Sequence, residues 1–323
     1  MSVSTKNLRF YGLDHRTFRF DLPRPLEFEL VQSFDSPAHS FEAIFPCDQL
    51  DPEFHYVEFW NGNKRLFRGM TDEQTITVND TGRRLKLIAR SQGALLLDSE
   101  ARPQKHENID LKDMFDCHLR PYGFMYLDAD YIPFFNNFPI QKGTSEWEAF
   151  YRFFRNSNHG TPYITADNRV VCHLDPNTGV THKISNQDPD ALHYSNLKMV
   201  NNRYSPITEY IIRNQDGLYS YCYQNPDQTT GLTRRRYLIP SGEFLDRDFR
   251  GWNEAAVRIL RSMLGKQVIT VTVPGYQDAS ICDRVALDWE LQTFPSLFVH
   301  QLRWKMSAAG MTTTFTLLDP QYL

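Results

Sequence analysis

The sequence predicts a mainly β protein with an α+β insert, in which two small, tube-like β-barrel domains flank a mixed α/β middle region. Three observations predict this class: an aromatic content of 14%, short stretches of alternating apolar and polar residues, and turn signals between them. Aromatic side chains fit pleated, half-buried surfaces, and short strands with frequent turns are typical of barrels and sandwiches. The predicted domains are residues 1–92, 93–197 and 198–323, and the last contains one helix.

The first predicted barrel consists of strands joined by tight hairpins. Apolar residues alternate with glutamates from Leu26 to Leu30, so they share one face of a strand. Asn61-Gly62 and the Asn-Asp-Thr-Gly sequence at 79–82 each separate two strand-like runs. Both indicate hairpins, because asparagine and glycine tolerate a positive φ.

Two helices are predicted in the middle region. One is expected to begin after Asp110, a suitable N-cap, and to end near Gly123. The second has a capping box at its start, formed by Ser145 and Glu148. Its apolar stripe is far more typical of a core than of a ligand site; the stripe consists of Trp147, Phe150, Tyr151 and Phe154. Between the helices, the Pro- and Asn-rich stretch 131–140 is predicted to be irregular.

Strands and turns are predicted to follow the second helix. A hairpin has Asp167-Asn168 at its tip, and the polar region 175–197 is interpreted as a loop or linker. Asp216-Gly217 marks a turn between two later strands, and a single helix is expected from about Asn253 to Leu264. The C-terminal run alternates strictly with period two. No internal repeat is apparent.

Charge and cysteine content exclude several classes of protein. A net charge of −4 argues against nucleic-acid binding, which needs many cationic contacts to phosphates. The five cysteines are far apart and form no CxxC, so they are interpreted as buried, reduced thiols rather than a zinc site or disulfide scaffold. The N-terminal residues lack the apolar segment of a secretory signal, and no apolar run approaches the ~20 residues that span a bilayer. Synthesis in a cytoplasm without membrane insertion is expected.

The serines of the strand-to-helix corner are weak candidates for a nucleophile. Ser91 lies in Ala-Arg-Ser-Gln-Gly, which lacks the leading glycine of a G-x-S-x-G elbow. We therefore interpret Ser91 as an N-cap of the short apolar segment after it. Ser99 lies between two acidic residues with no motif around it.

Histidines, acidic pairs and basic residues give no stronger candidate. Cys172 and His173 are strand neighbours that face opposite sides, so they are not expected to share a metal ion. Histidines in or near the polar loop are interpreted as solvated; they are His182 and His193. Two acidic pairs are weak candidates for a glycosidase or cation site; they are Asp128 with Asp130 and, more weakly, Asp246 with Asp248. The basic run Arg234–Arg236, followed by Tyr237, is interpreted as a solvated or subunit-pairing cationic loop. No phosphate-binding glycine motif occurs, so no catalytic, metal or cofactor residue is predicted.

Three stretches, in order along the chain, carry a resemblance to a known family. Residues 67–103 contain a strand, a hairpin and a serine-containing turn into a short helix. Residues 145–173 contain a Trp-bearing helix and the Asp-Asn hairpin, and residues 253–276 contain a helix that continues into a strand and a glycine turn. This order resembles the baseplate hub proteins of contractile-tailed phages, the Mu-type hub and late control D family, which are related in fold to the hub part of type VI secretion spike proteins. Residues 278–296 lack the Gly-x-Leu-Trp-x-Pro-Gly-like passage common in that family.

The resemblance implies a structural role in a virion tail baseplate or another contractile injection particle. Two tube-like barrels in each subunit of a homotrimer would form a pseudo-sixfold ring that joins the sixfold tail tube to the threefold central spike. The implied partners are two further copies, the spike, the tube and other baseplate proteins, with no cofactor and no enzymatic turnover. The alternatives are a tail-associated cell-wall hydrolase and a receptor- or carbohydrate-binding tail module.

Overall fold

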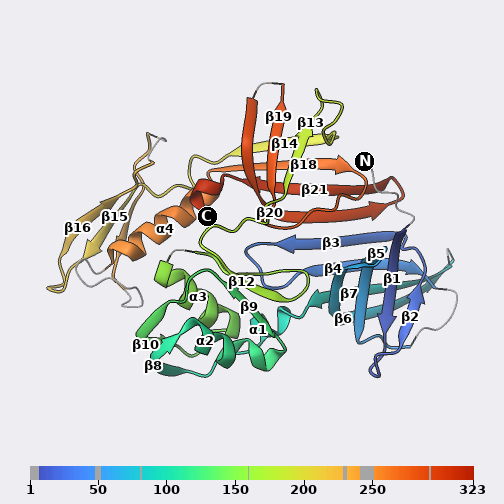
Figure 1. The fold of residues 1–323 in the computed structure, drawn as a ribbon, viewed down its shortest axis with the longest axis horizontal. Coiled ribbons are helices and arrows are strands. Elements are labelled where there is room, and N and C mark those ends of the chain that lie inside the picture. The colour runs from blue at the N-terminus through green and yellow to red at the C-terminus, as the bar shows by residue number, and fades with distance from the viewer. Residues whose placement is uncertain are drawn as a thin grey trace.

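The computed structural model describes residues 7–47, 52–80, 82–158, 160–227, 231–240, 251–290 and 292–323. Strands dominate this part of the chain, and a helical region lies below one large sheet in the view of Figure 1. The acidic pair Asp246 and Asp248 lies outside the described residues. The division of the chain at residues 92 and 197 stays a prediction.

One antiparallel-dominated sheet of 13 strands contains both the N-terminal and the C-terminal strands. Its path runs β14-β18-β21-β20-β3-β4-β7-β6-β5-β1-β2, and β19 and β13 branch from β20. The strands of the N-terminal half are β1 (Leu8–Leu13), β2 (Arg19–Leu22), β3 (Glu27–Ser33), β4 (Ser40–Pro46), β5 (Tyr56–Asn61), β6 (Lys64–Asn79) and β7 (Gly82–Ser91). Those of the C-terminal half are β13 (Thr181–Ser185), β14 (Asn196–Asn201), β18 (Gln267–Pro274), β19 (Arg284–Trp289), β20 (Gln292–Ser307) and β21 (Gly310–Leu318).

Local turn chemistry and strand alternation form the N-terminal half as predicted. Gly62, at φ 57°, lies in the turn between β5 and β6, and Gly82, at φ 113°, follows the turn between β6 and β7. The inner side chains of β1 meet those of β3 and β4; the ring centroids of Phe10 and Phe28 are 5.4 Å apart, and those of Phe10 and Phe45 are 5.7 Å apart. The sheet therefore folds back on itself around a phenylalanine core.

The expected closed barrels are not present in the described part of the chain. Neither half has a strand pair that joins its two ends, because β2 does not pair with β3 and β13 does not pair with β14. Instead β20 pairs with β3 and joins the two halves in one continuous sheet. A single hydrophobic cluster accordingly includes residues of both halves, from Phe10 to Leu317.

The middle region has its own core, built around two helices. Asp110 caps α2 with a reciprocal capping box, and Ser145 Oγ accepts a hydrogen bond from Glu148 N at the start of α3. Gly123, at φ 86°, ends the 3₁₀ turn after α2. Phe150 and Phe154 are fully buried in this core, as the apolar stripe predicts. The helices are α1 (Ala94–Asp98), α2 (Leu111–His118) and α3 (Glu146–Asn158), and the strands are β8 (Gln104–Asp110), β9 (Tyr126–Ala129), β10 (Phe134–Ile140), β11 (Tyr163–Ile164) and β12 (Arg169–Cys172).

Two segments predicted to be irregular are strands. The Pro- and Asn-rich stretch contains β10, which pairs antiparallel with β8. Phe135, Phe138 and Ile140 of β10 are buried in the core of the middle region. The predicted linker contains β13, which pairs in parallel with β19 and buries Ile184. Each strand pairs with a strand that is distant in the sequence, and the polar composition of the segment itself gives no sign of that partner.

A small sheet and a helix project from the C-terminal half (Figure 1). The sheet has the order β16-β15-β17, and Tyr210 and Ile212 on β15 pack against Ala255 and Ile259 of the helix. The Asp216-Gly217 turn joins β15 and β16, as predicted. The bounds are β15 (Glu209–Arg213), β16 (Tyr219–Gln224), β17 (Arg235–Leu238) and α4 (Trp252–Leu264), and Gly265 caps the end of the helix.

Candidate assembly edges

Ser91 has a structural role that differs from the predicted helix cap. It is the last residue of β7, 4% exposed, and its Oγ accepts a hydrogen bond from His39 N at 2.9 Å. The N-cap of α1 is Gly93, which has no side chain to offer. Ser99 is the C-cap of α1. The corner between the first strands and the middle region therefore uses Ser91 to satisfy the backbone of a neighbouring turn.

The acidic pair Asp128 and Asp130 is engaged with its own chain. Asp128 Oδ1 lies 3.0 Å from His173 Nε2, and Asp128 Oδ2 lies 3.8 Å from an Arg169 guanidinium nitrogen. Asp130 Oδ2 accepts a hydrogen bond from Leu174 N at 2.9 Å. These contacts fasten the end of β12 to β9, so the two carboxylates act as structural ties here.

His182 and part of the basic run belong to strands, whereas His193 lies in a loop. His182 was expected to be solvated but belongs to β13, where its Nε2 lies 2.7 Å from Oδ2 of the buried Asp283. His193 is exposed in a loop, as predicted. Arg235 and Arg236 belong to β17 rather than to a loop, and Arg235 Nε donates a 2.7 Å hydrogen bond to Glu209. Among the described residues, no group of three or more His, Cys, Asp or Glu side chains is arranged to hold a metal ion.

The two halves of the large sheet repeat one another, which the sequence did not reveal. The N-terminal order β3-β4-β7-β6-β5-β1 matches the C-terminal order β14-β18-β21-β20-β19-β13, strand for strand and in the same sequence order along the chain. We call these two sets module 1 and module 2. The one difference in direction is that β13 pairs in parallel with β19, whereas β1 pairs antiparallel with β5.

The central hairpins of the two modules match in register. Asn79 faces Gly82 in module 1 and Ser307 faces Gly310 in module 2, a constant offset of 228 residues given by the difference between 310 and 82. Gly82 and Gly310 have nearly the same φ, 113° and 111°. Each hairpin also has one bulge in its first strand, and the extra residues, Asp72 and His300, differ by the same offset. Because the bulge occurs at the same position in both hairpins, it is a regular structural feature of the module.

Within the chain, the two modules join along one seam. Residues 301–306 of β20 pair antiparallel with residues 28–33 of β3. The side chains that face the core at this seam are almost completely buried, with Leu30 and Leu302 at 0% exposure and Trp304 at 3%. On the opposite face, an Arg303 guanidinium nitrogen lies 3.8 Å from Glu29. We call this pairing the filled seam.

The two strand edges whose counterparts form the filled seam have no partner strand in the described chain. The equivalent of residues 301–306 in module 1 is residues 73–78 of β6, whose second edge pairs with no described strand. The equivalent of β3 in module 2 is β14, which pairs only with β18. Exposed apolar side chains mark both edges: Ile76 and Val78 on β6, 37% and 68% exposed, and Val200 on β14, 42% exposed. Unpaired edges of this kind are templates for pairing with another chain.

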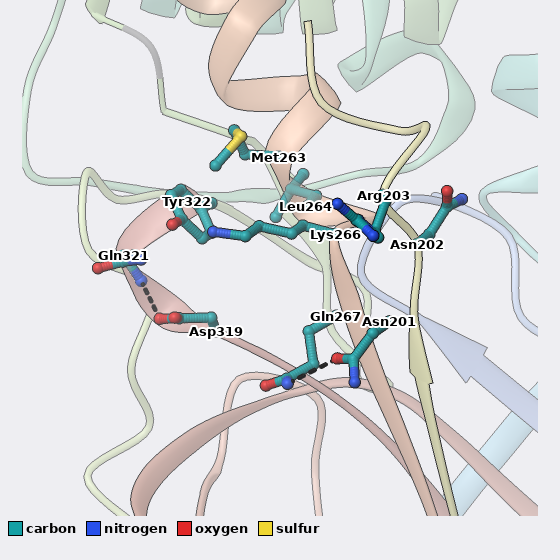
Figure 2. A pocket seen from close by; sticks show the side chains of 10 residues that line it. All are labelled: Asn201, Asn202, Arg203, Met263, Leu264, Lys266, Gln267, Asp319, Gln321 and Tyr322. Atoms are coloured by element: carbon teal, nitrogen blue, oxygen red, sulfur yellow. Dashed lines mark hydrogen bonds between the residues drawn. The ribbon is translucent and has the colours of Figure 1, made fainter. Parts of the chain in front are cut away.

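A pocket of about 330 Å³ lies where β14 ends. Figure 2 shows side chains from the end of β14, the C-terminus of α4, the start of β18 and the C-terminal 3₁₀ turn around it. Gln267 Nε2 donates a 2.8 Å hydrogen bond to Asn201 Oδ1, and the Lys266 ammonium lies 5.9 Å from the centre of the Tyr322 ring. Burial raises the pKa of Tyr322. The pocket is rich in amides, and one of them belongs to Asn201, the last residue of β14.

Comparisons with solved structures show that the chain has the fold of phage tail proteins. A tail protein of Neisseria meningitidis matches with a TM-score of 0.78 at 17% identity, covering 97% of this chain and 96% of that one. The 43 kDa tail protein of prophage MuSo2 of Shewanella oneidensis matches with a TM-score of 0.76 at 12% identity, covering 98% of both chains.

The fold also extends to secretion systems. An E. coli component of the type VI secretion system, described as structurally similar to the T4 tail proteins gp27 and gp5, matches with a TM-score of 0.59 at 11% identity. That match covers 97% of this chain and 76% of the other. No protein-family model and no curated protein matches the sequence. In the described part of the chain, no helix is long and apolar enough to cross a membrane.

Proposed function

We propose that this protein is a structural baseplate hub of a contractile phage tail or a related injection particle. Three copies would form a ring that joins the sixfold tail tube to the threefold central spike. The partners in this proposal are two further copies of the chain, the spike, the tube and other baseplate proteins. The protein would be made in the bacterial cytoplasm and would act in the virion baseplate without cofactor or turnover.

The observation that carries the proposal is the internal repeat. Each chain holds two modules with the same strand order in one continuous sheet, so three chains supply six modules. A ring of this composition has true threefold and approximate sixfold symmetry, which is what an adaptor between a sixfold tube and a threefold spike requires. The contact between successive chains would be heterologous, and such contacts close into rings when the rotation fits. The similarity to tail proteins over nearly the whole chain supports the same role.

A receptor- or carbohydrate-binding role is the second candidate, because one surface favours it. Tyr219 and Tyr237 lie exposed on the small sheet with their ring centroids 5.2 Å apart. Exposed aromatic faces bind apolar faces of ligands and partners. Glycan-array binding that Tyr237→Ala abolishes would support this role. The hydrolase alternative has no such support, because Asp128 and Asp130 are engaged in structural contacts.

Co-expression with the spike and tube proteins of the same particle tests the hub proposal. The expected result is a complex that purifies through a tag on the spike and that shows a threefold ring of six similar lobes in averaged electron micrographs. A chain that binds neither the spike nor the tube, and forms no ring with either present, would contradict the proposal.

A further inference from the structure

We infer that residues 73–78 of β6 pair antiparallel with β14 of a second copy of this chain, in the register of the filled seam. This inference rests on the proposed function, since it supplies the contact that joins one chain of the ring to the next. The partner is a second copy because these two open edges are the counterparts of β20 and β3, which pair with one another inside the chain. Inside the chain, β20 of module 2 pairs with β3 of module 1. In the equivalent contact between two chains, β6 of module 1 in one copy would pair with β14 of module 2 in the next copy.

The register follows from two constant offsets. The hairpins differ by 228 residues, so Gln301–Met306 of β20 corresponds to residues 73–78. Ala43 faces Leu87 and Val271 faces Phe315; because 315 exceeds 87 by the same 228, Val271 corresponds to Ala43. Phe28 faces Ala43 and Leu197 faces Val271, so β3 and β14 differ by 169 residues, the difference between 197 and 28. Transferring the filled seam gives six intermolecular pairs: Glu73 with Asn202, Gln74 with Asn201, Thr75 with Val200, Ile76 with Met199, Thr77 with Lys198, and Val78 with Leu197.

The transferred pairs are chemically compatible. On the face that continues the core, the filled seam has apolar pairs, Met306 with Phe28 and Trp304 with Leu30. The open edges place Val78 with Leu197 and Ile76 with Met199 at those two positions, which are again apolar pairs. Cross-strand apolar pairs of this kind each stabilise a sheet by roughly 0.2–1 kcal/mol relative to alanine. Val78 and Ile76, now exposed, would become covered as Met306 and Trp304 are in the filled seam.

The ends and the outer face of the contact are polar. Gln74 would meet Asn201, whose side chain already bonds Gln267 at the rim of the pocket in Figure 2. On the face away from the core, Thr77 and Thr75 would lie opposite Lys198 and Val200, and no like charges face one another in the six pairs. An apolar centre with a polar rim is the usual anatomy of a specific interface. The pocket would thus form one end of the intermolecular seam.

Disulfide trapping tests both the pairing and its register. Cys117 and Cys222 are exposed, so the interpretation of all five cysteines as buried thiols is wrong for these two. The background for the test is a chain with Cys117→Ser and Cys222→Ser, which removes both of them. Into it are placed Val78→Cys with Leu197→Cys, whose facing side chains meet the distance needed for a disulfide. The matched control is Thr77→Cys with Met199→Cys, which differs by a one-residue slip and places the two thiols on opposite faces of the sheet.

After mild oxidation, the in-register pair is expected to give covalent dimers and trimers on denaturing gels, with a ladder that stops at three copies, while the control stays at the mass of one chain. A chain that is trimeric by light scattering but remains unlinked in the in-register variant would overturn the pairing and leave the hub proposal standing. Linking that continues beyond three copies would support the pairing but contradict the closed ring. A monomer without any cross-link would overturn both.

Discussion

The buried imidazole of His39 predicts a loss of stability in mild acid. His39 lies in the connection between β3 and β4 and is 2% exposed, and its backbone N–H and C=O both bond Ser91 at 2.9 Å. Burial lowers the pKa of His39 to about 4, whereas the unfolded chain should titrate near the usual value of about 6.5. Between these two values the unfolded chain binds more protons than the folded one, so stability rises with pH across that window.

The size of the effect follows from the two pKa values. A difference of one pKa unit corresponds to about 1.4 kcal/mol, so full protonation of His39 should cost about 3 kcal/mol of folding free energy. The contribution is fully present above about pH 6.5 and is lost as the pH falls to about 4. The backbone of His39 bonds Ser91 at the end of β7, so the protonation acts where module 1 meets the middle region.

Urea unfolding of the wild type and His39→Gln, at one protein concentration and at about pH 7 and about pH 4.5, measures this term. The variant should lose less stability than the wild type over that interval, by about 2 to 3 kcal/mol, and any constant cost of the substitution cancels in the comparison. His193→Gln, in an exposed loop, should retain the wild-type dependence because it leaves His39 in place. Equal losses in the wild type and His39→Gln would refute the reasoning.

Three further predictions concern the seam, the repeat and the acidic pair. Leu302→Ala, at 0% exposure in the filled seam, should lower the free energy of unfolding in urea by about 2–5 kcal/mol. Leu218→Ala, 64% exposed, should change that free energy by less than about 0.5 kcal/mol. Similar changes in the two variants would contradict a contribution of the filled seam to stability. Gly82→Ala and Gly310→Ala should each cost about 1–3 kcal/mol, because both glycines have a φ near 110°; a cost at only one site would argue against equivalent hairpins. In a peptidoglycan zymogram, the wild type and Asp128→Asn should both fail to clear the gel, and clearing that Asp128→Asn removes would favour the hydrolase.

The sequence predicts most elements whose signals are local. The hairpins at Asn61-Gly62 and at 79–82, the Asp110 cap and the helix near 253–264 all form where expected, because each depends on residues within a few positions of one another. Strand alternation likewise predicts which face of the C-terminal run is buried, from Met311 to Leu317.

Long-range pairing accounts for the errors. The filled seam joins residues about 270 positions apart, such as Leu30 and Trp304, and no local pattern predicts that two barrel-like halves share one sheet. The same limit applies to His182, whose partner Asp283 is 101 residues away. The internal repeat escaped detection because the modules share alternation, a bulge and one glycine turn rather than residue identities. The sequence signal of the repeat is a pair of long strands, each followed by a glycine turn and a second strand.

The same limit affected the candidate site. Catalytic and metal sites have motifs in which the spacing of residues within the sequence is informative. An assembly edge has no such motif, since its signature is a row of backbone groups that no strand covers. Ile76 and Val78 look like ordinary strand residues in the sequence, and only the sheet order shows that their edge is open.

The solution mass of the purified chain, measured by light scattering on a size-exclusion column over a range of concentrations, tests the central claim most directly. The ring predicts a mass near three times the 37.8 kDa of one chain. A mass of one chain at every concentration, unchanged when the spike protein is co-expressed, would contradict it.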